Sequence, residues 1–261
     1  MHYESAGLGP SLLLISGLSF GGWIWYRQAP AFSRHFRIIC FDNRGSGFSD
    51  KPDENYTIDT FVADTVSLLD ALNIDKTHIV GVSLGGMIAQ KLALDYPDRV
   101  TSLVLCSTVF GGPNTVLPPM HVLQFMAQPA GTAEERFAQG VKNSFTPEFI
   151  EKNQTEIQFL KQKMSENRQP DYAYRRQVMA PLGFNVELRL TQLKMPVLVV
   201  AGGSDQAVPV ENARRLAQHI PNSTLHILER AGHLCFVEEP DAFNQLVIDF
   251  LMVSNKDHKR S

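Results

Sequence analysis

Short runs of apolar residues recur along the chain and predict buried β-strands. Their apolar content is nearly continuous rather than alternating with polar residues, which is typical of strands whose two faces are both covered. The runs with this pattern are residues 12–16, 37–41, 77–82, 100–107, 197–202 and 224–228.

Helical patterns lie between these predicted strands. Apolar spacing predicts helices over residues 58–72 and 84–96, and Pro240 suits the first turn of a helix over residues 241–253. Strands that alternate with helices favour a mostly parallel sheet with right-handed crossovers and helices on both faces. The predicted fold class is therefore α/β.

The alternation of strands and helices stops between residues 111 and 190. This stretch of about 80 residues is helix-like, is interrupted by Pro and Gly, and has no strand pattern. A plain loop of that length is uncommon in a compact domain, where loops rarely exceed roughly 15 residues. We therefore expect residues 111–190 to form a helical cap, inserted into a core made of residues 1–110 and 191–261.

Composition narrows the class of protein. The chain has 261 residues, 44% of them hydrophobic, and can bury one sizeable core. Its net charge is −3 and its basic residues are scattered, which argues against nucleic acid as a partner. No apolar run approaches the roughly 20 residues that cross a bilayer, so we expect no membrane partner. Cys40, Cys106 and Cys235 form neither an even disulfide framework nor a close metal-ligand pair, which favours a cytoplasmic location.

The clearest chemical signal is the stretch Gly-Val-Ser-Leu-Gly-Gly at residues 81–86. It matches Gly-x-Ser-x-Gly and falls between a predicted strand and a predicted helix. In that context the motif predicts a nucleophile elbow, a sharp turn that presents the hydroxyl of Ser83.

A serine nucleophile needs a base and a group that orients the base. Of the eight histidines, His233 follows the last predicted strand and precedes the last predicted helix, so it lies at the carboxyl edge of the sheet. Asp205 leaves the penultimate strand at the same edge. The order Ser83, Asp205, His233 is that expected of α/β-hydrolases and differs from the chymotrypsin-like and subtilisin-like orders. Taken alone, His233 could equally be a solvated loop histidine, and Asp205 could be an aspartate that caps a turn.

Acyl transfer also needs donors for the developing oxyanion. We expect the backbone N–H groups of Leu84, next to the nucleophile, and of Leu18, in the loop after the first apolar run. Gly17, Gly21 and Gly22 would let that loop approach the substrate, although any one of them is equally compatible with a flexible turn.

Two further motifs carry a family resemblance. Residues 42–49 resemble the Asp-x-Arg-Gly-x-Gly-x-Ser turn of the α/β-hydrolase superfamily, and residues 96–100 resemble its usual approach to the next strand. The resemblance extends over almost the whole chain. It implies the α/β-hydrolase fold, with Asp42 and Arg44 holding together the loop beside the active site.

Within the superfamily, residues 85–90 and 103–108 resemble small carboxylesterases and the 3-oxoadipate enol-lactonase-like group. Two departures stand out. Ser16 and Gly17 occupy the place of a His-Gly pair found in many relatives, so we expect a different brace for the oxyanion loop. Residues 1–7 resemble the second strand of the fold and leave no residues for the first, which predicts a sheet with an exposed edge that favours pairing.

These observations predict a serine hydrolase that cleaves small-molecule esters or lactones through an acyl-enzyme on Ser83, without a metal or organic cofactor. Enol-lactonase-like activity, cofactor-free perhydrolysis and carbon–carbon bond hydrolysis stay open, because they use the same triad. A catalytically silent binding protein on this fold is the alternative of another class. Ser rather than Asp at position 83 argues against dehalogenase or epoxide hydrolase chemistry.

The substrate pocket is the least defined prediction. We expect Trp23 from the core and His121, Phe125 and Met126 from the cap to line it. Four cap arginines could bind a substrate carboxylate or pair with nearby acids; they are Arg136, Arg168, Arg175 and Arg176. The sequence favours neither a monomer nor a homo-oligomer.

Overall fold

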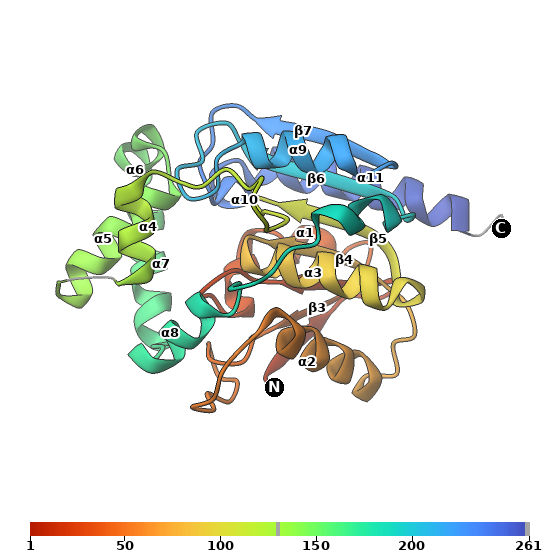
Figure 1. The fold of residues 1–261 in the computed structure, drawn as a ribbon, viewed down its shortest axis with the longest axis horizontal. Helices are drawn as coiled ribbons and strands as arrows, with labels where there is room; N and C mark the ends of the chain where they lie inside the picture. Colours follow the sequence, from red (N-terminus) through yellow and green to blue (C-terminus); the bar gives the residue numbers. More distant parts are fainter. Residues whose placement is uncertain (129–130, 259–261) are drawn as a thin grey trace.

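The computed structural model describes residues 1–128 and 131–258. Residues 129–130, in the predicted cap, and 259–261, at the end of the predicted core, lie outside this described part. Across it runs a seven-stranded sheet in the order β1-β3-β2-β4-β5-β6-β7, with β1 antiparallel to β3 and the other pairs parallel (Figure 1). The strands are β1 (Tyr3–Ala6), β2 (Ser11–Ile15), β3 (Arg37–Phe41), β4 (Thr77–Val82), β5 (Val100–Cys106), β6 (Val197–Gly202) and β7 (Ser223–Leu228).

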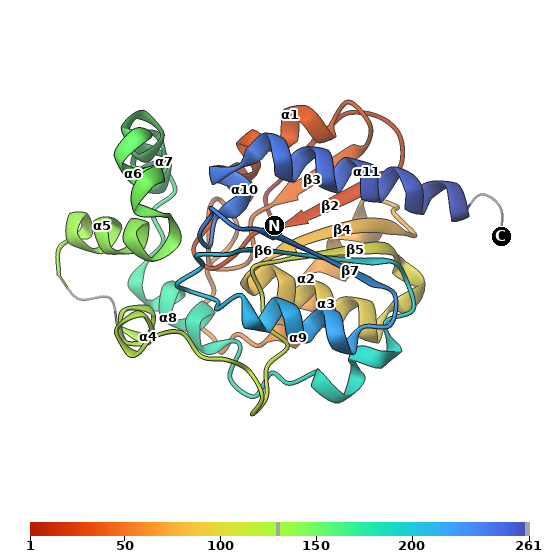
Figure 2. The ribbon, with the colours of Figure 1, turned by 90° about the horizontal axis from the view of Figure 1, so that it is seen from above.

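Helices cover both faces of the sheet, as Figure 2 shows. Alternate strand residues point to opposite faces, so Leu13 and Ile15 pack with α2, α3 and α9, whereas Leu12 and Leu14 pack with α1 and α11. This arrangement confirms the predicted α/β class. The helices of these two layers are α1 (Ala29–Phe32), α2 (Ile58–Ala71), α3 (Leu84–Asp95), α9 (Glu211–His219), α10 (Cys235–Glu238) and α11 (Pro240–His258), with 3₁₀ turns η1 (Gly22–Arg27) and η2 (Pro97–Arg99).

The two outer strands differ from the buried ones. All four residues of β1 are exposed, and β1 lies at the sheet edge with only β3 as its neighbour. In β7, which closes the opposite edge, half-buried and exposed residues alternate as far as Ile227, and Leu228 is buried. The inner strands β4 and β6 are buried at every position, which explains their continuous apolar runs.

Between β5 and β6 the regular structure in residues 107–128 and 131–196 is helical, apart from one bridge. Antiparallel pairing of Gly111 with Asn185, and a hydrogen bond from Val186 N to Phe110 O of 2.9 Å, bring the two ends of this segment together. The α-helices of its described residues are grouped beside the sheet in Figure 2. They are α4 (Met120–Ala127), α5 (Ala133–Ser144), α6 (Pro147–Lys152), α7 (Gln154–Glu166) and α8 (Asp171–Met179), followed by η3 (Glu187–Gln192).

None of the helices in residues 1–128 and 131–258 combines the length and the apolar character that a membrane span requires.

Candidate active site

Ser83 occupies a strained turn between β4 and α3. Its φ of 54° and ψ of −117° lie in a region that non-glycine residues rarely adopt. Neighbouring groups hold the turn: Ser83 N donates to Cys106 O at 2.9 Å, and the hydroxyl of Thr108 donates to Ser83 O at 2.7 Å. The turn has the geometry that a nucleophile elbow requires.

The glycines of the motif are explained by the close approach of the start of α3 to β2 and β4. A Cβ atom on Gly85 would lie 2.2 Å from the carbonyl oxygen of Ile15, and one on Gly81 would lie 2.4 Å from that of Gly85. Both contacts are with backbone atoms, which cannot swing aside. The helix can therefore begin directly after Ser83 only if these positions lack side chains.

Asp205 and His233 form a buried pair. His233 Nδ1 lies 2.8 Å from Asp205 Oδ2. With the carboxylate as acceptor, Nδ1–H is the donor, and the neutral imidazole then has its lone pair on Nε2. The other carboxylate oxygen, Oδ1, accepts from the backbone N–H groups of Ala207 (2.8 Å) and Val208 (2.7 Å). The Asp205 side chain is fully buried, so its orientation is fixed on both sides.

Contacts at the end of β5 place Ser83 and the His233 loop at the same edge of the sheet. Cys106, whose carbonyl holds Ser83 N, has its sulfur 3.6 Å from that of Cys235, two residues after His233. Contact with Cys106 and burial raise the pKa of the Cys235 thiol well above its usual range. Cys235 therefore stays neutral at this contact, which suits packing rather than nucleophilic attack.

The loop after β2 passes directly beside Ser83. A Cβ atom on Gly17 would lie 3.3 Å from Ser83 Cβ and 3.9 Å from its Oγ, so the glycine backbone lies close against the Ser83 side chain. Leu18 is the next residue in the loop. On the other side, Leu84 is the first residue of α3, where a backbone N–H has no acceptor within the helix.

Polar contacts that sequence reasoning did not identify hold this loop. The Ser16 hydroxyl donates to Phe20 O at 2.8 Å, and Asn43 Nδ2 donates to Ser16 O at 3.1 Å. Ser19, with φ of 68°, donates its N–H to Oε1 of Gln177 in α8 at 3.0 Å. Asn43 belongs to the recognised turn of residues 42–49, whereas nothing in the sequence around Gln177 indicated this contact.

Asp42 and Arg44 take part in structural contacts around that loop. The Asp42 carboxylate accepts from Gly22 N and from Phe48 N, each at 2.7 Å. Arg44 Nη2 donates to Asp64 Oδ1 in α2 at 2.7 Å. Both residues thus connect segments around the loop, in the manner that the family resemblance implied.

The two tryptophans after the loop differ in exposure. Trp25 is fully buried and lies with its ring centroid 4.9 Å from that of Phe236. Trp23 is half-buried and meets Phe20 of the loop edge-on at 5.8 Å. Trp25 thus anchors the core, and Trp23 is the one beside the loop after β2.

The three predicted cap residues of the pocket all lie on α4. His121 is exposed, while Phe125 and Met126 are half-buried. The Phe125 ring faces Gly140 of α5, and Met126 O accepts from the hydroxyl of Tyr174 at 2.8 Å. Their contact with substrate stays a prediction.

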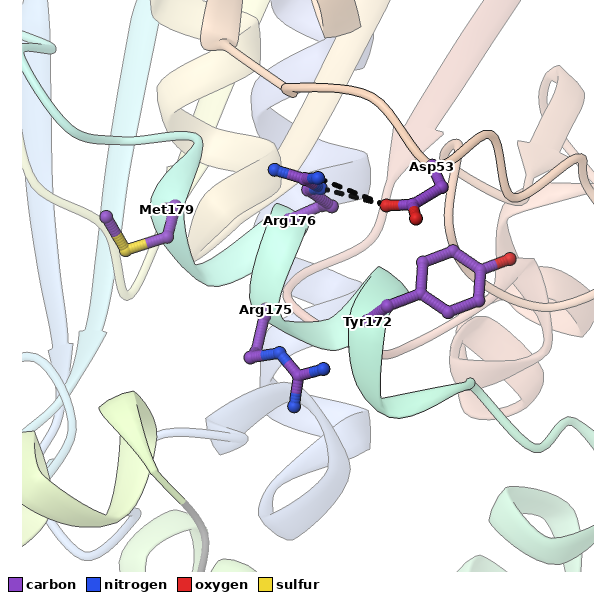
Figure 3. Close-up of a pocket in the computed structure, with 5 residues that line it drawn as sticks. All are labelled: Asp53, Tyr172, Arg175, Arg176 and Met179. Atoms are coloured by element: carbon purple, nitrogen blue, oxygen red, sulfur yellow. Dashed lines mark hydrogen bonds and ion pairs between the residues drawn. The ribbon is translucent and has the colours of Figure 1, made fainter.

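A cavity of about 350 Å³ lies between α8 and the loop that precedes α2 (Figure 3). Arg176 in its wall donates to Asp53 at 3.1 Å, and Arg136 pairs with Asp171 at 3.6 Å. These two cap arginines therefore have acidic partners, one of the two alternatives that the sequence left open. The cavity is lined by Asp53, Tyr172, Arg175, Arg176 and Met179.

In the described part of the chain, no three His, Cys, Asp or Glu side chains are grouped as metal ligands.

Comparison with known proteins gives the family. Residues 10–240 match the alpha/beta hydrolase fold family. The chain is 31% identical over 253 residues to 3-oxoadipate enol-lactonase 2 of Acinetobacter baylyi, covering 95% of this chain and 91% of the relative. It is 30% identical to the 2-hydroxy-6-oxononadienedioate/2-hydroxy-6-oxononatrienedioate hydrolase of Paraburkholderia phymatum, covering 96% and 90%. The crystal structure of the enol-lactonase from Burkholderia xenovorans LB400 superposes with a TM-score of 0.86 at 27% identity, covering 96% of each chain.

The chain therefore belongs to the alpha/beta hydrolase fold family.

Proposed function

We propose that this protein is a serine hydrolase that cleaves carboxylic esters or lactones of small molecules. Family membership supports hydrolase activity in general. The observation that carries the finer proposal is the buried Asp205–His233 hydrogen bond at the same sheet edge as the strained Ser83. A protein that only bound a ligand would not need a serine in a costly backbone conformation.

The proposed reaction follows from this arrangement. His233 Nε2 takes the proton of Ser83 Oγ as that oxygen attacks the carbonyl carbon, and Asp205 stabilises the imidazolium through Nδ1–H. The imidazolium then protonates the leaving alcohol, so that the acyl group stays on Ser83. Water, deprotonated by His233, releases the acid and restores the serine. Each step needs only these three side chains.

The developing oxyanion would accept from the backbone N–H groups of Leu18 and Leu84, which flank Ser83. Removing one such donor in other enzymes costs about 2.7–4 kcal/mol. Preorganisation matters here because the loop is held by Ser16, Asn43 and Gln177 before substrate arrives. The backbone itself supplies the donors, and side-chain substitution at Leu18 should leave them in place.

We also propose that residues 111–190 act as a cap over this edge, separate from the core of residues 1–110 and 191–261. The paired segment ends at Gly111 and Asn185 support that division. Trp23, Phe125 and Met126 would then contribute an apolar wall for the acyl or lactone part of the substrate. The buried, unpaired cysteines support a reducing, cytoplasmic location.

The substrates to be tested should include lactones, because the similar proteins include enol-lactonases. The test is a turnover profile with p-nitrophenyl esters of graded chain length, an enol-lactone, 2-hydroxy-6-oxononadienedioate, and monochlorodimedone with peroxide and acetate. We expect turnover of esters or lactones that is lost in Ser83→Ala. No turnover across the panel, together with tight binding of one of these molecules, would favour a silent binding protein instead.

A further inference from the structure

The loop that carries His233 is held on both sides of the histidine. Gly232 N donates to Glu238 Oε1 at 2.7 Å, and Leu234 N donates to Ser144 O, at the end of α5, at 3.0 Å. A Cβ atom on Gly232 would lie 2.9 Å from Ser144 O and equally close to Glu238 Oε1. The histidine loop is therefore seated against the junction of α5 and α6.

One carboxylate joins the histidine loop to that junction. Besides Gly232 N, Glu238 accepts from Thr146 at two places: the hydroxyl at 2.7 Å and the backbone N–H at 3.2 Å. Thr146 Oγ1 in turn accepts from Phe149 N at the start of α6. Burial raises the pKa of Glu238 although these hydrogen bonds act to lower it. The carboxylate is thus largely withdrawn from water and committed to these partners.

The proposed chemistry explains why such a brace would matter. His233 must accept a proton from Ser83 and return it to the leaving group, and a misplacement of about 1 Å in an active site can cost about 10²-fold in rate. Asp205 fixes the orientation of the ring through Nδ1, but the position of the ring also depends on the position of the His233 backbone. Glu238 fixes the backbone one residue before it.

We propose that Glu238 is a positioning residue for His233, and that through Thr146 it couples the cap to the catalytic base. The position of the α5–α6 junction would then set the position of the imidazole, so that cap movement on substrate binding is transmitted to the base. This inference rests on the proposed function of Ser83, Asp205 and His233. Glu238 itself touches no reacting atom in this scheme.

The test compares Glu238→Ala and Glu238→Gln with a matched control, Glu239→Gln. Glu239 is the next residue, and within residues 1–128 and 131–258 its carboxylate has no hydrogen bond or ion pair and acts on Glu238 through its charge alone. With p-nitrophenyl acetate as the probe, we expect Glu238→Ala to lower kcat about 30- to 100-fold with KM changed less than about 3-fold. Glu238→Gln should retain more activity, with a loss of about 10-fold, since its amide oxygen can still accept from Gly232 N. Glu239→Gln should stay within about 2-fold of wild type.

A double-mutant cycle tests the coupling to the cap. Thr146→Val removes the hydroxyl donor and should lower kcat about 3- to 10-fold, whereas adding it to Glu238→Ala should cost little more, because the pair acts as one unit. Additive losses would overturn the coupling. Should Glu238→Ala unfold at the assay temperature, Glu238→Gln decides: kcat equal to that of Glu239→Gln would overturn the positioning role. Ser83→Ala separates the two hypotheses, since full turnover in that variant would refute the proposed function, whereas an inactive Ser83→Ala with unaffected Glu238 variants would refute this inference alone.

Discussion

Replacing Asp205 with Asn tests the histidine tautomer directly. Oδ1 of Asp205 accepts two backbone N–H groups, from Ala207 and Val208, and Oδ2 faces His233 Nδ1. In Asp205→Asn the amide oxygen must stay toward the two N–H donors, so its NH₂ group turns to His233. Nδ1 then has to accept, the ring proton moves to Nε2, and Nε2 loses the lone pair that takes the proton of Ser83.

The magnitude follows from this loss of the base. The corresponding substitution in a chymotrypsin-type triad lowers kcat about 10⁴-fold, which corresponds to about 5.4 kcal/mol of transition-state stabilisation. Because the side chain keeps its shape and its bonds to the backbone, the free energy of unfolding should change by less than about 2 kcal/mol. Steady-state hydrolysis of the best ester or lactone, alongside urea unfolding, measures both. A folded Asp205→Asn variant with more than a tenth of wild-type kcat would refute the tautomer argument.

Three further predictions concern the glycine contacts, the oxyanion loop and the cap. Gly85→Ala should lower the free energy of unfolding by about 3 kcal/mol or more, whereas Gly140→Ala, whose Cβ would meet only the Phe125 ring at 3.9 Å, should raise it by about 0.5–1 kcal/mol. Urea unfolding measures both changes, and a Gly85→Ala variant as stable as wild type would contradict the first. Gln177→Leu leaves the N–H of Ser19, in the loop after β2, without its acceptor and should lower kcat about 10-fold. Unchanged kinetics would show that this hydrogen bond does not support the proposed oxyanion site. Burial raises the pKa of Tyr174 to about 12, so its contribution to stability is full below its unfolded pKa near 10 and is lost as pH rises toward 12. The melting temperature of Tyr174→Phe should accordingly fall less over that pH range than that of wild type, and parallel curves would contradict the shift.

Much of the fold could be predicted because burial on both faces leaves a strong signal. The inner strands β4 and β6 appear in the sequence as apolar runs, and both of their ends coincide with the predicted ones. The sequence also predicted the strand-to-helix turn at Ser83, because the Gly-x-Ser-x-Gly motif lies between a strand pattern and a helix pattern. The structure adds the steric reason for Gly81 and Gly85, whose Cβ atoms would collide with backbone atoms. Helix ends were less exact: α2 ends at Ala71, one residue before the prediction.

The contacts that brace the site could not be predicted. Gln177 and Ser19 are 158 residues apart, and Glu238 and Thr146 are 92 apart. A polar residue on a helix has the same pattern in sequence whether it faces water or a backbone N–H of a distant loop. Such partners depend on how residues 111–190 pack against the rest of the chain, which local periodicity does not encode.

The most direct test of the central claim is the site at which a fluorophosphonate attaches. Intact-mass and peptide analysis after labelling should show one adduct per chain on the peptide that contains Ser83, and Ser83→Ala should lose both the adduct and the hydrolysis of esters or lactones. Stoichiometric labelling of Ser83→Ala, or an adduct on another residue of the wild-type protein, would contradict the assignment of the nucleophile.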